Sequence, residues 1–324
     1  MMTLPDFRYK QCLFYFSSKQ SKITFRASNL VIKDDKENTK LQHSCHKSFV
    51  LFIIGNVTLS NVLMIQAKKH GFPIILLSYN LRVDGYINNR AEGNFLLRKK
   101  QYSLAEKELM IAKKLVRQKV DNQIALIHGL RYRSKEDNET IAEMRSICLD
   151  HAEDYQELMG LEGIASKLFF SCYFRLLDWK ARLPRTKYDI ANLLLDIGYT
   201  YLFNFVEAML GCYGFDIYCG VYHKFFYQRK SLVCDIIEPF RCIIDERLRK
   251  AHNLKQIDPN DFLLIKGQYT MPFKNQKRYT SLFMQDILDR KEEIFLYVQS
   301  YYRWLIKGKE DEDFPVFCIY TKPK

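Results

Sequence analysis

The chain has 324 residues, 48% of them hydrophobic, and 50 Lys and Arg against 37 Asp and Glu give it a net charge of +13 at pH 7. This composition excludes disorder as the main state, and the length suits two domains of about 150 residues each or one large domain. The positive charge favours a polyanionic partner and argues against an acid-rich binding protein, without identifying that partner.

Cysteine usage and the chain start indicate a compartment. Nine cysteines occur without a Cys-x-x-Cys pair, which favours buried thiols in a reducing environment over a disulfide framework. Asp6 and Lys10 interrupt the apolar stretch that a signal peptide needs, and the longest apolar runs, 49–54 and 73–77, are far below membrane-spanning length. We therefore expect a soluble cytoplasmic protein with no membrane partner.

Residues 11–90 contain short runs of β-branched and aromatic residues that predict strands. Polar segments at 17–21 (SSKQS) and 33–39 (KDDKENT) are expected as turns between them. One helix, over 60–70, interrupts this region, with Ser60 as its N-cap and Gly71 as its stop. The predicted strands cover residues 12–16, 22–27, 30–33, 49–54, 73–79 and 81–87.

From about residue 92 the apolar spacing changes to the helical period, as over 104–120 and 139–159. The fold class expected is α+β, with an N-terminal β-sheet-rich domain over 1–91 and a larger all-α-helical domain over 92–324. The first part holds 13 Lys and Arg against 5 acids, and the second 37 against 32. A polyanion site in the helical part must therefore be a local patch.

The first acid in an unusual setting is Glu162, in the run LMGLEGIASKLFF. Gly160 and Gly163 flank it, and each glycine costs a helix roughly 1 kcal/mol relative to alanine. Small neighbours let another group approach closely. Two interpretations remain open, a tight helix crossing with Glu162 at its rim and access for a ligand.

A basic loop precedes the next predicted helix. Arg182, Arg185 and Lys187 cluster around Pro184, as suits contact with a phosphate backbone. The helix that follows carries one polar face and one apolar face. A solvated basic loop beside a polar helix face remains the alternative. The polar face is formed by Asp189, Asn192, Asp196 and Tyr199.

A third segment, residues 220–250, places His223 among aromatic residues, with Asp235 and Glu238 three residues apart and so on the same side of a turn or helix start. Pro239 is compatible with a helix start because the first turn needs no amide donor there. A histidine beside aromatic rings is more commonly a core residue than a ligand, and that alternative stays open for His223 alone.

Glu162, His223 and Glu238 together make a mixed oxygen and nitrogen site. Carboxylate oxygens suit Mg²⁺ or Mn²⁺, and one imidazole shifts the preference toward Mn²⁺. Zinc is disfavoured, because the cysteines lack ligand spacing and the HSCH run at 43–46 is too short for a finger. A metal ion at such a site can polarise a phosphodiester and stabilise the leaving oxygen, which indicates phosphoryl transfer on a nucleic acid.

These segments, in this order, resemble the CRISPR-associated endonuclease and integrase of spacer acquisition. The resemblance runs over LEGIASKLFF, RLPRTKYDIANLLLDIGY, GVYH and LVCDIIEPFR, and the β-rich start with GNVTLS before a helix is similar too. It covers most of the chain. The four motifs are specific jointly, although each alone is weak.

The resemblance implies roles for five residues. Glu162, His223 and Glu238 match the three metal ligands of the catalytic site, and Asp235 matches an accessory catalytic acid that positions the metal or its waters. Arg241 is three residues after Glu238 and is expected to pair with it or to contact DNA phosphate. Relatives often have Asp where this chain has Glu238, which lengthens one ligand arm.

The resemblance also implies an assembly and a reaction. Such proteins dimerise through their β domains, and two homodimers flank a central dimer of a small ferredoxin-like adaptation subunit in a heterohexamer. The complex holds double-stranded DNA whose 3′-hydroxyl ends attack phosphodiesters at the boundary of the CRISPR repeat. The positive β domain and the loop from Arg182 to Lys187 are then expected to face DNA phosphates.

Two other functions remain as alternatives. A structure-selective DNA nuclease of repair would use the same site for hydrolysis without joining strands. A non-catalytic nucleic-acid-binding scaffold would bind DNA in a salt-dependent manner without any metal dependence. The scaffold gives no reason for Glu162 to lie between glycines or for Asp235 and Glu238 to be so close.

Overall fold

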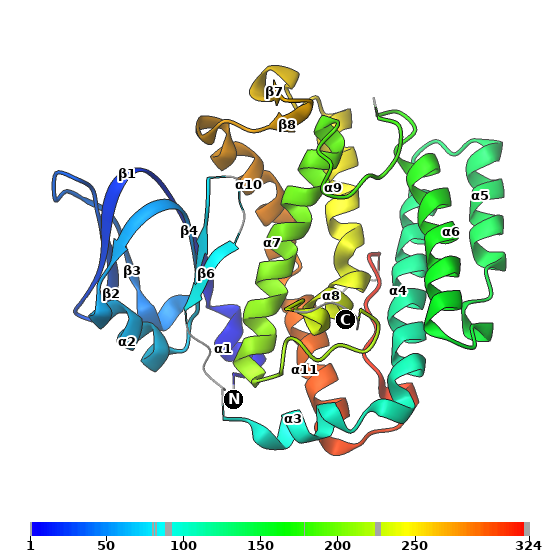
Figure 1. Ribbon diagram of the computed structural model, residues 1–324, viewed down its shortest axis with the longest axis horizontal. Helices are drawn as coiled ribbons and strands as arrows, with labels where there is room; N and C mark the ends of the chain where they lie inside the picture. The colour runs from blue at the N-terminus through cyan, green and yellow to red at the C-terminus, as the bar shows by residue number, and fades with distance from the viewer. Residues whose placement is uncertain are drawn as a thin grey trace.

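The computed structural model describes residues 2–79, 81, 83–87, 93–177, 179–223 and 228–320, except for the side chains of residues 18–20. In this part of the chain a sheet-rich region comes first, and a larger helical region follows beside it (Figure 1). The predicted α+β class is confirmed. The boundary predicted between residues 91 and 92 lies outside the described residues.

The sheet is mixed, and its six described strands follow the order β3-β2-β1-β4-β5-β6. β1 is parallel to β4, and β4 is parallel to β5, whereas the pairs β1 with β2, β2 with β3 and β5 with β6 are antiparallel. The strands are β1 (Gln11–Arg26), β2 (Asn29–Lys33), β3 (Thr39–Ser44), β4 (Ser48–Leu59), β5 (Ile74–Leu77) and β6 (Val83–Ile87).

One predicted turn is wrong. Residues 17–21 continue β1 as a single strand, and the register against β4 shifts between Ser17 and Ser21. The Ser17 hydroxyl donates to the Asn56 carbonyl oxygen at 2.7 Å, so polar residues serve a bulge inside the sheet rather than a turn. The other predicted turn forms, and Asp34 Oδ1 accepts hydrogen bonds from two backbone amides within it.

β4 joins the two regions because it is apolar on both faces. Leu51 and Ile53 belong to a core cluster shared with α2 (Asn61–His70), and Phe52 on the other face lies edge-on to Tyr201 with ring centroids 6.5 Å apart. Strand side chains alternate between faces, so a strand that is covered on both sides needs a continuous apolar run. Residues 49–54 are at most 1% exposed.

The ends of α2 follow their sequence signals. The Ser60 hydroxyl accepts a hydrogen bond from the Leu63 amide at 3.2 Å, and Gly71 ends the helix in the left-handed conformation with φ at 69°. Both predicted caps are confirmed.

The helical region surrounds α7 (Ile190–Tyr213), which lies beside the sheet, between it and several of the other long helices (Figure 1). The other helices are α1 (Leu4–Arg8), α3 (Phe95–Tyr102), α4 (Glu108–His128), α5 (Lys135–Ser146), α6 (Tyr155–Tyr173), α8 (Ser231–Ile237), α9 (Arg241–Asn253), α10 (Phe273–Asp289) and α11 (Lys291–Lys307). A short hairpin of β7 (Leu263–Ile265) and β8 (Gln268–Thr270) lies between α9 and α10.

One predicted helical run is divided in the structure, and one helix of the fold resembles a membrane span. Residues 139–159, expected as one periodic run, are divided between α5 and α6 by a 3₁₀ turn over Leu149–His151. Among the described residues, α7 alone has the length and composition of a membrane span, and 83% of its most apolar window is buried inside the fold. It is the central core helix of this region.

Candidate active site

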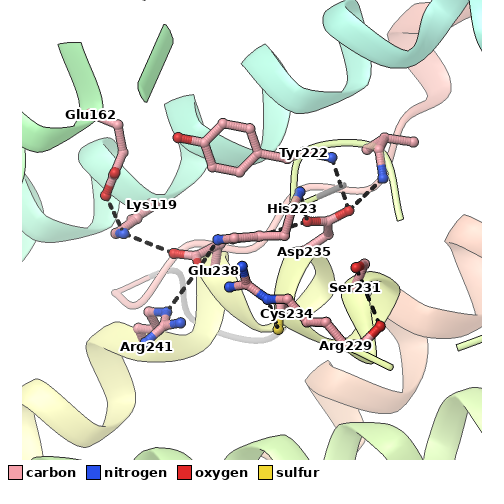
Figure 2. A network of polar contacts seen from close by, with 11 residues as sticks. Lys119, Glu162, Tyr222, His223, Arg229, Ser231, Cys234, Asp235, Glu238 and Arg241 are labelled. Atoms are coloured by element: carbon pink, nitrogen blue, oxygen red, sulfur yellow. Dashed lines mark hydrogen bonds and ion pairs between the residues drawn. The ribbon is translucent and has the colours of Figure 1, made fainter. Parts of the chain in front are cut away.

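Four segments that are distant in the sequence line one cleft (Figure 2). α6 contributes Glu162, the loop after α7 contributes His223, and Glu238 begins the 3₁₀ turn Glu238–Phe240 that follows α8. α4 contributes Lys119, which lies outside the predicted set. The structure thus places the three residues expected to share a site on the wall of one cleft.

The glycines around Glu162 face open space. A Cβ atom built on Gly160 or Gly163 meets no neighbour within 4 Å, and Gly163 lines the cleft. The alternative of a tight helix crossing at these glycines is therefore wrong. The absence of side chains here leaves the approach to Glu162 open.

Asp235 organises the loop that carries His223. Its carboxylate is fully buried, and Oδ2 accepts hydrogen bonds from the amides of Val221 at 2.6 Å and Tyr222 at 3.1 Å. Oδ1 accepts from the His223 amide at 3.0 Å and contacts its ring Nδ1 at 2.8 Å. A Cβ atom on Gly220 would lie 2.6 Å from Oδ2, so this close approach requires glycine. Asp235 is a positioning residue for His223.

His223 presents its second ring nitrogen to the cleft. A carboxylate only accepts hydrogen bonds, so in the neutral ring the Asp235 contact holds the proton on Nδ1 and leaves the lone pair on Nε2. Nε2 lies 3.9 Å from Glu238 Oε1, and the side chain is 20% exposed. The alternative of a core histidine is therefore wrong. Hydrogen bonding of Nδ1 to a carboxylate is the usual arrangement of a metal-ligating histidine.

Glu238 is the most buried of the three predicted metal ligands, at 2% exposed. Its Oε1 lies 3.0 Å from Arg241 Nε, and its Oε2 lies 2.8 Å from Lys119 Nζ. The contact to Lys119 lacks hydrogen-bond geometry, so Oε2 is buried without accepting a hydrogen bond. Burial alone would raise the pKa of Glu238, but Arg241 and Lys119 outweigh burial and lower it to about 2.

Lys119 bridges the two glutamates. Its Nζ lies 2.5 Å from Glu162 Oε1 and 2.8 Å from Glu238 Oε2, and its side chain is 13% exposed. Burial alone would lower the pKa of Lys119, but Glu238 and Glu162 more than offset burial and raise it. A sequence signal exists, because Lys119 follows Ile111 and Leu115 at four-residue spacing and so puts a cation on the apolar face of α4.

The basic loop is docked onto α7 through Arg182 and its backbone, while the Arg185 side chain stays exposed. Arg182 donates to Asn192 Oδ1 at 2.9 Å and to Asp196 Oδ1 at 2.6 Å, and its side chain is 12% exposed. The Arg185 amide donates to Asp196 Oδ2 at 2.9 Å, while its side chain is free to face the cleft. The Lys187 carbonyl oxygen accepts from the Tyr269 amide of β8. The predicted polar face of α7 therefore holds the loop in place.

Tyr199 connects this loop to the site. Its ring lies 5.4 Å from the Arg182 guanidinium carbon and 4.8 Å from that of Arg241. Its hydroxyl donates to the buried Asp245 carboxylate at 2.5 Å. Burial raises the pKa of Asp245 to about 7, against the opposing effect of the Tyr199 hydrogen bond.

The cleft has a volume of about 1610 Å³ and combines a basic lining with an acidic centre. Nine cations line it against four acids. The described cations are Lys119, Lys167, Arg175, Lys180, Arg182, Arg185, Lys187, Arg229 and Arg241, and the acids are Glu162, Asp196, Glu238 and Asp245. Such a surface attracts a polyanion, while Glu162 and Glu238 meet around one cation, the Lys119 ammonium.

Three comparisons with known proteins agree. An endonuclease Cas1 from Thermodesulfovibrio yellowstonii is 27% identical over 273 residues, covering 80% of this chain and 86% of that protein. A Cas6-RT-Cas1–Cas2 complex matches with a TM-score of 0.83 at 20% identity, covering 97% of this chain and 36% of that one. A casposase bound to an integration product matches with a TM-score of 0.76 at 18% identity, covering 97% and 95%. The two structures share the fold.

The family model described as CRISPR associated protein Cas1 matches residues 14–285, which include every residue of the site described above. It extends from the sheet into α10 and so spans both regions of the fold. The chain belongs to the family of the CRISPR associated protein Cas1.

Proposed function

We propose that this protein is a metal-dependent DNA endonuclease and integrase that inserts short foreign DNA into a CRISPR array. The observation that carries the proposal is the convergence of Glu162, His223 and Glu238 in a cleft otherwise lined by cations. Family membership supports it, as do the endonuclease name of the bacterial relative and the integration product bound by the casposase.

The proposed reaction is a transesterification. The 3′-hydroxyl of the incoming duplex attacks a phosphodiester at the repeat boundary, and a new P–O bond forms as the old one breaks. The proton of the attacking hydroxyl is lost as the P–O bond forms, and the leaving 3′-oxygen of the repeat strand takes up a proton to become a free 3′-hydroxyl, so no net proton is released. Water as nucleophile gives plain cleavage at the same site.

The donor types fit Mg²⁺ or Mn²⁺, and gathering them round one ion requires side-chain movement, because no three His, Cys, Asp or Glu side chains of the described residues stand close enough to hold a metal ion. Carboxylate oxygens from Glu162 and Glu238 with the free Nε2 of His223 are donors of the right type. Glu238 Oε2 is buried and makes a close ionic contact with the Lys119 ammonium at 2.8 Å, without hydrogen-bond geometry, so this oxygen already faces a cation. When bound, the cation supplies stabilisation of the charge that develops on the phosphodiester oxygens.

The chain itself orients these donors and the DNA. Asp235 fixes the ring of His223, and Arg241 holds the Glu238 carboxylate. Arg185 and Lys187 are available for phosphate contacts, and Arg182 holds their loop on α7. Neutralising the phosphates in this way would make DNA binding salt-dependent.

We propose the assembly from the same family relationship. The domain over residues 1–91 is assigned to dimerisation and DNA contact, and the domain over 92–324 to catalysis. Two homodimers would flank a central dimer of a small ferredoxin-like adaptation subunit in a cytoplasmic heterohexamer. The fold match to a chain of a Cas6-RT-Cas1–Cas2 complex supports such a partner.

A metal titration tests the proposed function against its alternatives. Supercoiled repeat plasmid and a 3′-hydroxyl duplex are incubated with Mn²⁺, Mg²⁺ or EDTA, with and without the partner subunit. The proposal expects joined strands with either metal and none in EDTA. A repair nuclease would give hydrolysis but no joined strands even with the partner. A scaffold would bind DNA equally with and without metal and change no strand.

A further inference from the structure

Lys119 occupies the position between the two glutamates that are the proposed metal ligands. Its ammonium lies within 2.8 Å of an oxygen from each. Within the part of the chain that the structure describes, no three His, Cys, Asp or Glu side chains stand close enough together to hold a metal ion. In this arrangement a side-chain cation takes the place that a divalent cation would need.

The backbone on either side of this contact is tethered. Asn122, one turn after Lys119 on α4, donates through Nδ2 to the carbonyl oxygen of Pro239, the residue after Glu238. The same amide donates to Phe317 and accepts from the Ile319 amide in the C-terminal segment. These bonds fix α4 against the turn that carries Glu238, so separating Lys119 from Glu238 requires motion of the lysine side chain rather than of the backbone.

The cleft gives the Lys119 side chain room to move. Lys119 lines the cleft, and its four-carbon stem is flexible enough to carry the ammonium away from the carboxylates. A DNA phosphate in the cleft offers the ammonium an alternative anionic partner in place of the carboxylates. Without such movement, the ammonium and a divalent cation bound to the same oxygens would repel each other at close range.

We propose that Lys119 is a resident counter-ion that competes with the divalent metal for Glu162 and Glu238. The proposal rests on the proposed metal-dependent function and adds a regulation of that site. In the metal-free protein the ammonium neutralises the glutamate pair. Metal binding displaces it, and DNA promotes the displacement because a phosphate takes over the ammonium, so DNA and metal bind with positive coupling.

The test is Mn²⁺ binding to the full-length protein by titration calorimetry, with and without duplex DNA. Lys119→Met should bind Mn²⁺ roughly tenfold more tightly than wild type without DNA, since an ion pair worth about 1.4 kcal/mol no longer has to be broken. Lys119→Arg, which keeps the charge, should bind as wild type does. Lys113→Met, a lysine of α4 that is not among the residues lining the cleft, is the matched control and should leave Mn²⁺ binding unchanged.

DNA supplies the second measurement. It should tighten Mn²⁺ binding more in wild type than in Lys119→Met, and the thermal midpoint without metal should be lower in Lys119→Met. If Lys119→Met does not fold, Lys119→Gln is used in its place. If neither neutral variant folds, the test is whether duplex DNA tightens Mn²⁺ binding to wild type and to Lys119→Arg. If DNA does not tighten Mn²⁺ binding in these proteins, the proposal is overturned.

Failure of this inference is distinguishable from failure of the proposed function. If wild type binds Mn²⁺ and Glu162→Gln does not, while the folded neutral variants bind no more tightly than wild type, Lys119 is not a competing counter-ion and only this inference fails. If wild type shows no Mn²⁺ binding that Glu162→Gln removes, the metal-dependent function itself fails.

Discussion

A single carboxylate oxygen of Asp235 binds both the backbone amide and the ring Nδ1 of His223, at 3.0 and 2.8 Å. The other oxygen holds two further amides of the same loop. One buried acid thereby sets the position of the loop and the orientation of the ring. His223 can act on a ligand only through Nε2, on the side facing Glu238.

Asp235→Asn should therefore weaken metal binding at the site, although it replaces none of the three proposed metal ligands. An amide keeps one acceptor and turns a donor toward the loop amides, so we expect loss of about 1–3 kcal/mol of unfolding free energy. Misorientation of His223 should weaken Mn²⁺ binding roughly 10- to 100-fold. Urea denaturation and calorimetry measure the two effects. Asp150→Asn, a surface ion-pair partner, is the control, and equal Mn²⁺ affinity in both variants would contradict the role assigned to Asp235.

The glycines offer a matched comparison. Gly220→Ala places a Cβ atom 2.6 Å from Asp235 Oδ2 and 2.7 Å from Ser231, and should destabilise the protein by roughly 1–3 kcal/mol. Gly160→Ala meets nothing within 4 Å and should stabilise α6 by up to about 1 kcal/mol. Thermal unfolding measures both. Destabilisation by Gly160→Ala would mean that the helix is packed closely at this point after all.

Asp245 should make stability depend on pH. Burial raises its pKa from 3.8 to about 7, so between these values the folded state holds a proton that the unfolded state has released. The stabilisation is complete below about pH 4 and is lost as the pH rises toward and through 7, by about 1.4 kcal/mol for each pH unit in that window. Asp245→Asn lacks this dependence.

Urea denaturation of wild type and Asp245→Asn at pH 5 and pH 8 gives the measurement. Other groups titrate in both proteins, so their effects cancel in the difference. Wild type should lose stability relative to the variant between pH 5 and pH 8. A difference that stays constant would show that Asp245 titrates in the folded protein as it does in the unfolded one.

The two arginines of the basic loop should have different roles, Arg182 in stability and Arg185 in DNA binding. Arg182→Ala removes the bonds to Asn192 and Asp196 and should cost about 1–3 kcal/mol of stability. Arg185→Ala removes only an exposed side chain, and should leave the thermal midpoint unchanged while lowering the salt slope of duplex binding by about 0.9. Binding titrations at several salt concentrations decide, and an unchanged slope for Arg185→Ala would remove this residue from the interface.

The sequence predicted what depends on local signals. The caps of α2 at Ser60 and Gly71 follow from side-chain and backbone preferences that need no tertiary partner. The apolar run 49–54 likewise predicts a strand, and β4 forms there. The convergence of Glu162, His223 and Glu238 was expected from donor chemistry and family resemblance, and the fold brings these residues to one cleft.

What escaped prediction depends on contacts between distant segments. Lys119 is far from both Glu162 and Glu238 along the chain, so a cation on an apolar helix face does not reveal its partners before folding. Residues 17–21 have turn composition, but pairing with β4 draws them into a strand with a bulge. Arg182 has the spacing of a phosphate contact, and only the docked loop shows that Asp196 takes its charge.

Covalent strand joining tests the central claim most directly. A labelled 3′-hydroxyl duplex is incubated with repeat plasmid, partner subunit and Mn²⁺, and label transfer is compared among wild type, Glu162→Gln, His223→Ala and the control Glu157→Gln on the exposed surface of α6. Transfer should occur with wild type and Glu157→Gln and fall at least roughly 100-fold in the two site variants and in EDTA. Equal transfer by wild type, Glu162→Gln and His223→Ala would contradict the assignment of this cleft as the active site.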